Sequence, residues 1–138
     1  MNTEKDRDYW TICVNYGSVF EMSPPAKVRF LRDRRGFLDF GYVDAKGQMS
    51  GLTISLCPPE VYRFIFDTEE SAWRAYARSN ASPIGYLSGH WEGVEHRTRE
   101  FTALAAREDV PEYARAILRA EVERAERLRT QIPIVEED

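Results

Sequence analysis

Residues 27–43 read KVRFLRDRRGFLDFGYV, and this stretch decides the fold. Two runs rich in strand-forming residues, 27–31 and 37–43, are separated by the polar segment 32–36. That segment ends in Gly36, and glycine most readily adopts the left-handed conformation that a tight hairpin turn requires. The stretch therefore predicts an antiparallel hairpin with a strongly basic turn.

Further strands are predicted on both sides of this hairpin. Upstream, residues 9–16 alternate in polarity, and a short strand follows at 19–22. The next residues include Pro24-Pro25, which we expect to stop further pairing because proline has no backbone N–H. Downstream, residues 49–57 alternate again. The predicted apolar faces are Trp10, Ile12, Val14 and Tyr16 in the first strand and Leu52, Ile54 and Leu56 in the last.

The second half of the chain reads as helical. Residues 61–66 are interpreted as a fifth strand, with an irregular lead-in to a helix as the alternative. Helices are then predicted at 68–79, at about 94–106 and at about 111–129, where apolar residues recur at helical spacing. The first of these helices has a clear apolar stripe, formed by Ala72, Trp73, Tyr76 and Ala77.

Two predicted helix starts match the capping-box pattern, in which a small polar residue is followed three positions later by glutamate. Asp67 with Glu70 precedes the helix at 68–79, and Asp109 with Glu112 precedes the last helix. Each acidic residue is expected to accept hydrogen bonds from backbone amides of the first turn.

These elements predict an α+β fold: an N-terminal antiparallel β-meander of four to five strands, followed by three helices packed on one face. The length of 138 residues suits one domain over 1–138, with 1–7 and 136–138 as flexible tails. The N-terminus is polar and has no apolar run behind it, so we expect no secretory signal and a cytoplasmic protein. Cys13 and Cys57 are expected to be ordinary reduced thiols.

The basic hairpin is the most distinctive candidate for function. It concentrates five cations in a protein whose net charge is −4, with aromatic residues beside them. A solvated turn whose rings belong to the core is the more common arrangement. The functional alternatives are contact with a protein partner and, after it, binding of single-stranded nucleic acid by phosphate contacts and base stacking. The cations are Lys27, Arg29, Arg32, Arg34 and Arg35, and the rings are Phe30, Phe37, Phe40 and Tyr42.

A second candidate is the segment around two histidines. His90, Glu92, Glu95 and His96 are the only cluster of potential metal ligands in the sequence. Their spacing differs from that of helical zinc sites, in which two histidines lie one turn apart. We therefore predict no metal site, no cofactor and no catalytic residues, and a small enzyme using His90, Glu92 or His96 is the last of three hypotheses.

The first hypothesis is a protein-interaction module, such as an adaptor, an immunity protein or a phage-type inhibitor, that binds a larger protein or nucleoprotein complex. It combines the absence of a catalytic pattern with an abundance of residues typical of interfaces. The loop predicted at 81–93 adds Tyr86 and Trp91, although packing of Trp91 in the core is the more common outcome. The predicted contact residues are Arg29, Arg32, Arg34, Arg35, Tyr86 and Trp91.

Overall fold

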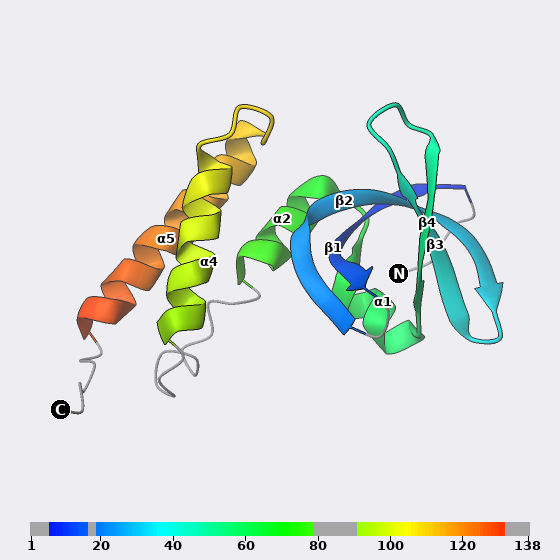
Figure 1. The fold of residues 1–138 in the computed structure, drawn as a ribbon, viewed down its shortest axis with the longest axis horizontal. Coiled ribbons are helices and arrows are strands. Elements are labelled where there is room, and N and C mark those ends of the chain that lie inside the picture. Colours follow the sequence, from blue (N-terminus) through cyan, green and yellow to red (C-terminus); the bar gives the residue numbers. More distant parts are fainter. Residues whose placement is uncertain (1–5, 17–18, 79–90, 132–138) are drawn as a thin grey trace. The chain divides into compact units, whose positions relative to one another are not determined.

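A computed structural model describes residues 6–16, 19–78 and 91–131 of the chain. A five-stranded antiparallel sheet comes first and is followed by helices (Figure 1), which confirms the predicted fold class and the N-terminal meander. The described residues contain four helices, one more than predicted. The strands are β1 (Asp8–Tyr16), β2 (Val19–Arg34), β3 (Phe37–Val43), β4 (Met49–Leu56) and β5 (Ile65–Phe66), and the helices are α1 (Pro58–Phe64), α2 (Glu69–Arg78), α4 (Trp91–Ala105) and α5 (Glu112–Gln131).

The chain divides into two compact units, Met1–Tyr76 and Ala77–Asp138. The single domain over 1–138 and the packing of all helices on one face of the sheet stay predictions. Most of the two tails predicted at 1–7 and 136–138 lies outside the described residues. Of the residues described there, Asp6 donates its backbone N–H to the carbonyl of Phe30 at 3.1 Å, and the carbonyl of Arg7 accepts the Phe30 N–H at 3.3 Å.

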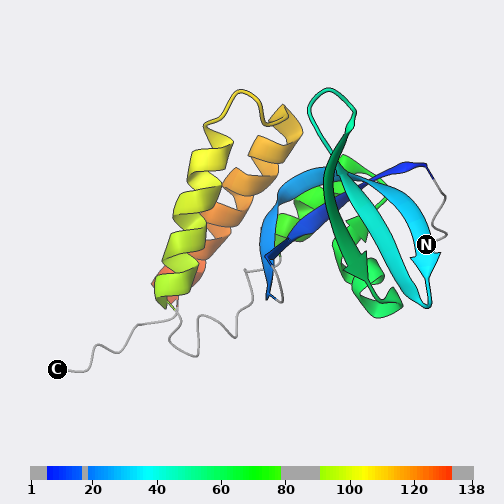
Figure 2. The same ribbon diagram turned by 45° about the vertical axis from the view of Figure 1, so that its right-hand side comes forward.

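The sheet has the strand order β4-β3-β2-β1-β5, and every neighbouring pair is antiparallel. The long strand β2 connects the two halves of the sheet, because it pairs with β1 along its first part and with β3 along its last part. Figures 1 and 2 show β2 as a long, strongly curved strand, and the strand order places β4 at one edge of the sheet. Both strands of the basic hairpin therefore lie inside the sheet, with another strand on each side.

The prediction that Pro24 and Pro25 stop pairing is wrong. β2 runs through them as one strand, so the strands predicted at 19–22 and 27–31 are continuous. The register shifts at this point: Thr11 pairs with Ala26 while Cys13 pairs with Met22, so Ile12 alone faces three residues of β2. Such a bulge leaves backbone groups out of the ladder, which is where proline is tolerated in a sheet.

The core lies between the sheet and α1. Its buried side chains come from all five strands and from Val61 of α1, and α1 contacts β1, β3, β4 and β5. The apolar face predicted for the first strand is wrong in part: Tyr9 and Cys13 belong to the core cluster, whereas Trp10 is only half-buried, with the Lys27 Nζ 5.7 Å from its ring centroid. The core residues are Tyr9, Cys13, Val28, Phe30, Phe40, Ile54, Leu56, Val61 and Ile65.

The strand predicted at 61–66 is largely wrong. Residues Pro58–Phe64 form α1, and only Ile65 and Phe66 pair with β1. Proline is well tolerated in the first helical turn because its missing N–H has no partner there in any case. Glu60 closes the helix start, since its Oε1 accepts the backbone N–H of Cys57 at 3.0 Å.

The remaining helices match the predicted ranges within a few residues, but their caps differ. In α2 the predicted stripe is buried, and Thr68 rather than Asp67 caps the helix: the Thr68 Oγ1 accepts the Ser71 N–H at 3.2 Å. Near the start of α5, Asp109 accepts the Arg107 Nε at 2.9 Å instead of forming the predicted capping box. Helices α4 and α5 pack as a hairpin through Phe101, Leu104, Ala114 and Leu118. Among the described helices, none has the length and apolar content needed to cross a bilayer.

Candidate interaction site on the basic hairpin

The hairpin turn consists of two residues rather than the predicted five. Arg35 and Gly36 have backbone φ angles of 56° and 88°, and the residues on either side, Arg34 and Phe37, are paired across the strands. Two successive positive φ angles define the turn type whose twist matches that of the flanking strands. The side chain of Asp33 supports the turn, because its Oδ1 accepts the Gly36 N–H at 3.1 Å. The basic residues at 32 and 34 therefore belong to β2.

Asp39 is the centre of the site, although no pattern in the sequence predicts it. This carboxylate is 2% exposed although it lies on the outer face of the sheet, the side away from the core cluster. Its Oδ2 accepts the Nε of Arg32 at 2.9 Å and the Nε of Arg34 at 3.1 Å, while its Oδ1 accepts the hydroxyl of Ser55 at 2.6 Å. We call these four residues the Asp39 bracket.

Charge and hydrogen bonding keep Asp39 ionised. The hydrogen bonds from Ser55 and then from Arg34 and Arg32 hold its pKa below the ordinary value, and they outweigh burial, which would raise it. A buried carboxylate with opposite charges and three donors is stable, whereas one without partners would not be. The single negative charge of Asp39 thus holds the guanidinium groups of Arg32 and Arg34 on the same face of β2.

The two guanidinium groups remain available to solvent. The side chains of Arg32 and Arg34 are 64% and 60% exposed, although each uses its Nε to bind Asp39. A guanidinium carries five N–H donors in a planar fork, so its outer edge can still bind an incoming oxygen anion. Because Asp39 already orders both side chains, a ligand that binds there loses less conformational entropy.

The other cations of the hairpin are in different situations. Arg29 binds the carboxylate of Asp8, with its Nε 2.8 Å from Oδ1, and its side chain is 28% exposed. Lys27 is exposed but lies against Trp10. Arg35 is exposed at the tip of the turn. The site therefore carries its accessible positive charge at the turn end of the hairpin.

Of the four aromatic residues beside the hairpin, three face the core. Phe30 and Phe40 are buried in the core cluster and pack edge to face, and Tyr42 donates its hydroxyl to the carbonyl of Cys13 at 2.8 Å. Phe37 is the exception, with 50% of its surface exposed beside Arg34. Of these four rings, only that of Phe37 is therefore available to a partner.

Apolar side chains border the bracket on the side away from the turn. At Gly41 an added Cβ would lie 3.3 Å from the Cδ1 of Leu31 and would collide with the end of the Met49 side chain. The ends of Leu31 and Met49 therefore fill the space above Gly41, and Met49 is 40% exposed. A charged centre with Phe37 on one side and Met49 on the other has the composition of a protein interface.

The segment around the two histidines lies only partly in the described part of the chain. His96 is exposed and Glu95 is half-buried on α4. Trp91 and Glu92 belong to the first turn of α4, but their side chains, like all of Tyr86 and His90, lie outside the described residues. Among the residues whose side chains the structure describes, no three or more His, Cys, Asp or Glu lie together so that they could hold a metal ion.

Glu60 lies near both cysteines. The Sγ of Cys57 donates to the Glu60 Oε1 at 3.0 Å. Burial, and then the charge of Glu60, raise the pKa of the Cys13 thiol to about 11. Both thiols are free, and the buried one is held in its unreactive form.

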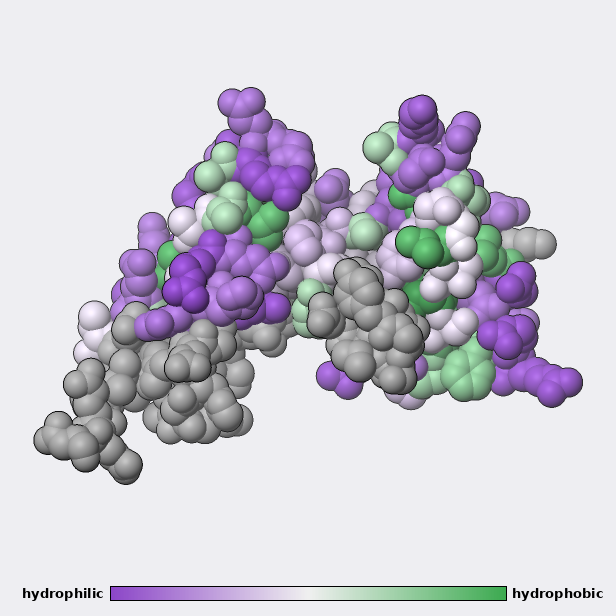
Figure 3. All heavy atoms as spheres, viewed as in Figure 1, coloured by the Kyte–Doolittle hydropathy of each residue, from purple (hydrophilic) through white to green (hydrophobic). Residues whose placement is uncertain are grey.

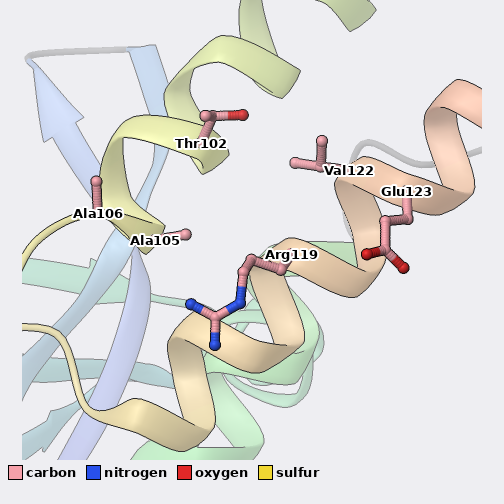
Figure 4. A pocket seen from close by; sticks show the side chains of 6 residues that line it. All are labelled: Thr102, Ala105, Ala106, Arg119, Val122 and Glu123. Carbon is pink, nitrogen blue, oxygen red and sulfur yellow. The ribbon is translucent and has the colours of Figure 1, made fainter.

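A shallow groove of about 340 Å³ lies between α4 and α5 (Figure 4). Its lining combines short side chains with one arginine and one glutamate, and Figure 4 shows no convergence of polar groups toward a common point. It offers no chemistry comparable to the Asp39 bracket. The lining residues are Thr102, Ala105, Ala106, Arg119, Val122 and Glu123.

Comparison of the chain with protein-family models, curated proteins and solved structures finds no match in any of the three.

Proposed function

We propose that this chain is a protein-interaction module that binds an acidic surface of a larger partner through the outer face of β2 and β3. The observation that supports this proposal best is the Asp39 bracket, which orders Arg32 and Arg34 while leaving their outer edges in solvent. An adaptor, an immunity protein or a phage-type inhibitor would use such a surface. Tyr86 and Trp91 stay predicted contacts.

The order of Arg32 and Arg34 in the unbound protein lowers the entropic cost of binding a partner. An exposed arginine normally loses roughly 0.5–1.5 kcal/mol of side-chain freedom when an interface immobilises it. In Arg32 and Arg34 the hydrogen bonds to Asp39 already restrict that freedom in the unbound protein. Phe37 adds an exposed aromatic ring next to these charges, and arginine and aromatic residues dominate the energetics of interfaces.

Binding of single-stranded nucleic acid is the alternative, and the same arginines would contact phosphates. It has less support because that mode of binding relies on exposed stacked rings, and Phe30 and Phe40 are buried. The enzyme hypothesis rests on His90, Glu92 and His96, of which only the exposed His96 has a described side chain.

The test is co-purification of the tagged chain from its host cells, comparing variants of this face with a matched control elsewhere. Phe37→Ser and Arg35→Asn should each reduce recovery of a partner about tenfold or more, because each removes an exposed aromatic or cationic side chain at the turn end of the proposed interface. Tyr62→Ser removes an aromatic ring that is 68% exposed on α1, and it should leave recovery unchanged.

The partner recovered in this way is then titrated directly against each purified variant. Equal affinity for the wild-type chain, Phe37→Ser and Arg35→Asn would show that the hairpin is not the interface. A nuclease-sensitive partner whose binding falls steeply with salt would favour the nucleic-acid alternative instead.

A further inference from the structure

Strand β4 forms an edge of the sheet with unusual composition. Among the described residues its only strand neighbour is β3. It reads MSGLTISL over Met49–Leu56, with neither a charged residue nor a proline. Where β4 runs in Figure 1, the space-filling view in Figure 3 shows a band of hydrophobic and neutral side chains bordered by hydrophilic ones. Natural sheets usually protect such an edge with lysine, proline or a covering segment, because an open edge pairs with other strands.

The hairpin register determines which backbone groups of β4 point outward. In a two-residue turn the flanking residues, Arg34 and Phe37, form a hydrogen-bonded pair. Direction alternates along an antiparallel strand, so Asp39 directs its backbone N–H and C=O toward β2. Its partner on the other side, Ser55, must then direct its own backbone groups to the open edge, and so must Thr53, which pairs with Gly41.

The side chains along this edge have different characters on the two faces of the sheet. Thr53 and Ser55 lie on the outer face, where Ser55 is part of the Asp39 bracket. Leu52 lies on the opposite face, in line with Ile54, and is 69% exposed. A strand added here would therefore meet hydroxyl groups and guanidinium groups on one face and an apolar side chain on the other.

We propose that the partner supplies an extended segment of alternating acidic and apolar residues, which pairs with β4 as an additional strand. This inference rests on the proposed function and specifies its binding mode. Main-chain hydrogen bonds to Thr53 and Ser55 provide affinity, and the side chains provide specificity. Its acidic side chains point toward Arg32 and Arg34, and its apolar side chains pack on Leu52.

The distances are compatible with this arrangement. Adjacent strands lie about 4.8 Å apart, so an added strand is about 10 Å from β3. The guanidinium groups of Arg32 and Arg34 already lie over β3, where their Nε atoms meet Asp39. Across that distance, a glutamate side chain from the added strand can meet the outer edge of a guanidinium group. Charge complementarity thus favours an acidic strand at this edge over a basic one.

The test uses a synthetic heptapeptide that alternates glutamate with valine, a version with lysine in place of glutamate, and an N-methylated acidic version that lacks the donors for pairing. The acidic peptide should bind at least about tenfold more tightly than the lysine peptide. N-methylation should weaken its binding about tenfold or more. In the bound state, hydrogen exchange at Thr53 and Ser55 should slow by at least about tenfold, because both amides become paired.

Variants of the chain complete the test. Thr53→Pro removes one outward N–H while leaving the pairing with β3 intact, and should weaken binding of the acidic peptide about tenfold, because one peptide carbonyl loses its donor. Thr53→Glu adds a negative charge at the edge; it should weaken the acidic peptide and strengthen the lysine peptide, and it serves if the proline variant does not fold.

Three outcomes would overturn strand addition. One is equal binding of the acidic peptide and its N-methylated form to the wild-type chain. Another is a dimer of the free chain that Thr53→Pro dissociates, which would place a second copy on the edge. The third is a native partner that Thr53→Pro retains and Phe37→Ser loses; that result would leave the proposed function standing. Retention of the partner by Phe37→Ser and Arg35→Asn would remove the proposed function itself.

Discussion

Ser55 on β4 donates its hydroxyl to the Oδ1 of Asp39 on β3 at 2.6 Å, on the side of the carboxylate opposite Arg32 and Arg34. Replacement of Asp39 by asparagine leaves two arginines side by side without their shared anion. We therefore expect Asp39→Asn to lower the free energy of unfolding at pH 7 by about 1–3 kcal/mol, the usual cost of breaking a buried charged hydrogen bond. Urea denaturation checks the value.

This loss should depend on pH. The folded pKa of Asp39 lies below the ordinary aspartate value of about 3.9, so its contribution is present above that pH and disappears as pH falls through the folded pKa. The difference between the wild-type chain and Asp39→Asn should shrink steadily below about pH 4. Asp67→Asn is the control, because its contact with Arg7 is 3.6 Å long and half exposed. A difference that stays constant down to pH 2 would contradict the role given to Asp39.

Much of the fold could be predicted from the sequence because the signals are local. The alternating strands, the apolar stripe of α2 and the glycine of the hairpin turn all report on neighbouring residues. The errors arose where a local rule met a tertiary constraint. Pro24 and Pro25 lie in a bulge of a continuous strand, and Pro58 begins a helix where a fifth strand was expected to follow.

The site was only half predictable. The sequence pattern indicated the arginines. However, the predicted turn over 32–36 places Arg32 and Arg34 outside the strand, and a turn of that length gives no sign of their hydrogen bonds to Asp39. The real turn is two residues long, and with it Arg32 pairs with Asp39 and Arg34 with Phe37. A non-glycine residue at positive φ, such as Arg35, is uncommon, so the sequence favoured the longer turn. The contact of Asp39 with the two arginines depends on this register, and no local sequence pattern around Asp39 indicates it.

The cap of α2 provides a second prediction. Thr68 accepts the Ser71 N–H at 3.2 Å, whereas Asp67 makes a long ion pair with Arg7. Thr68→Ala should lower the free energy of unfolding by about 1 kcal/mol, the usual value for a lost N-cap. Asp67→Ala should cost less than about 0.5 kcal/mol. Thermal denaturation of both variants checks this order, and the reverse order would restore the capping box expected from the sequence.

The two thiols should react at very different rates. Cys13 is fully buried and its pKa is raised to about 11, so it presents almost no thiolate at neutral pH. Cys57 is partly exposed at the end of β4. With an aromatic disulfide reagent at pH 8, we expect one thiol to react in the native state and the second only after unfolding, at a rate at least about a hundredfold lower. Cys57→Ser should remove the fast phase, and a fast phase that persists would place the reactive thiol at Cys13.

The hairpin turn provides the last prediction, in which stability and binding change in opposite directions. Arg35 holds a φ of 56°, a conformation that asparagine adopts more easily than arginine. Arg35→Asn should therefore raise the free energy of unfolding by roughly 0.5–1 kcal/mol while removing an exposed positive charge from the proposed interface. Urea denaturation and titration against the recovered partner measure the two effects separately.

Gly36→Ala is the matched change at the neighbouring position. Its φ is 88° and an added Cβ would meet nothing within 4 Å, so any loss of stability reflects backbone strain alone. We expect that loss to be about 1 kcal/mol, with affinity for the partner unchanged once the variant is folded. If Arg35→Asn stabilised the chain and left affinity intact, the positive charge at the tip of the turn would have no part in recognition. Misfolding could not explain that result, because the variant would be at least as well folded as the wild type.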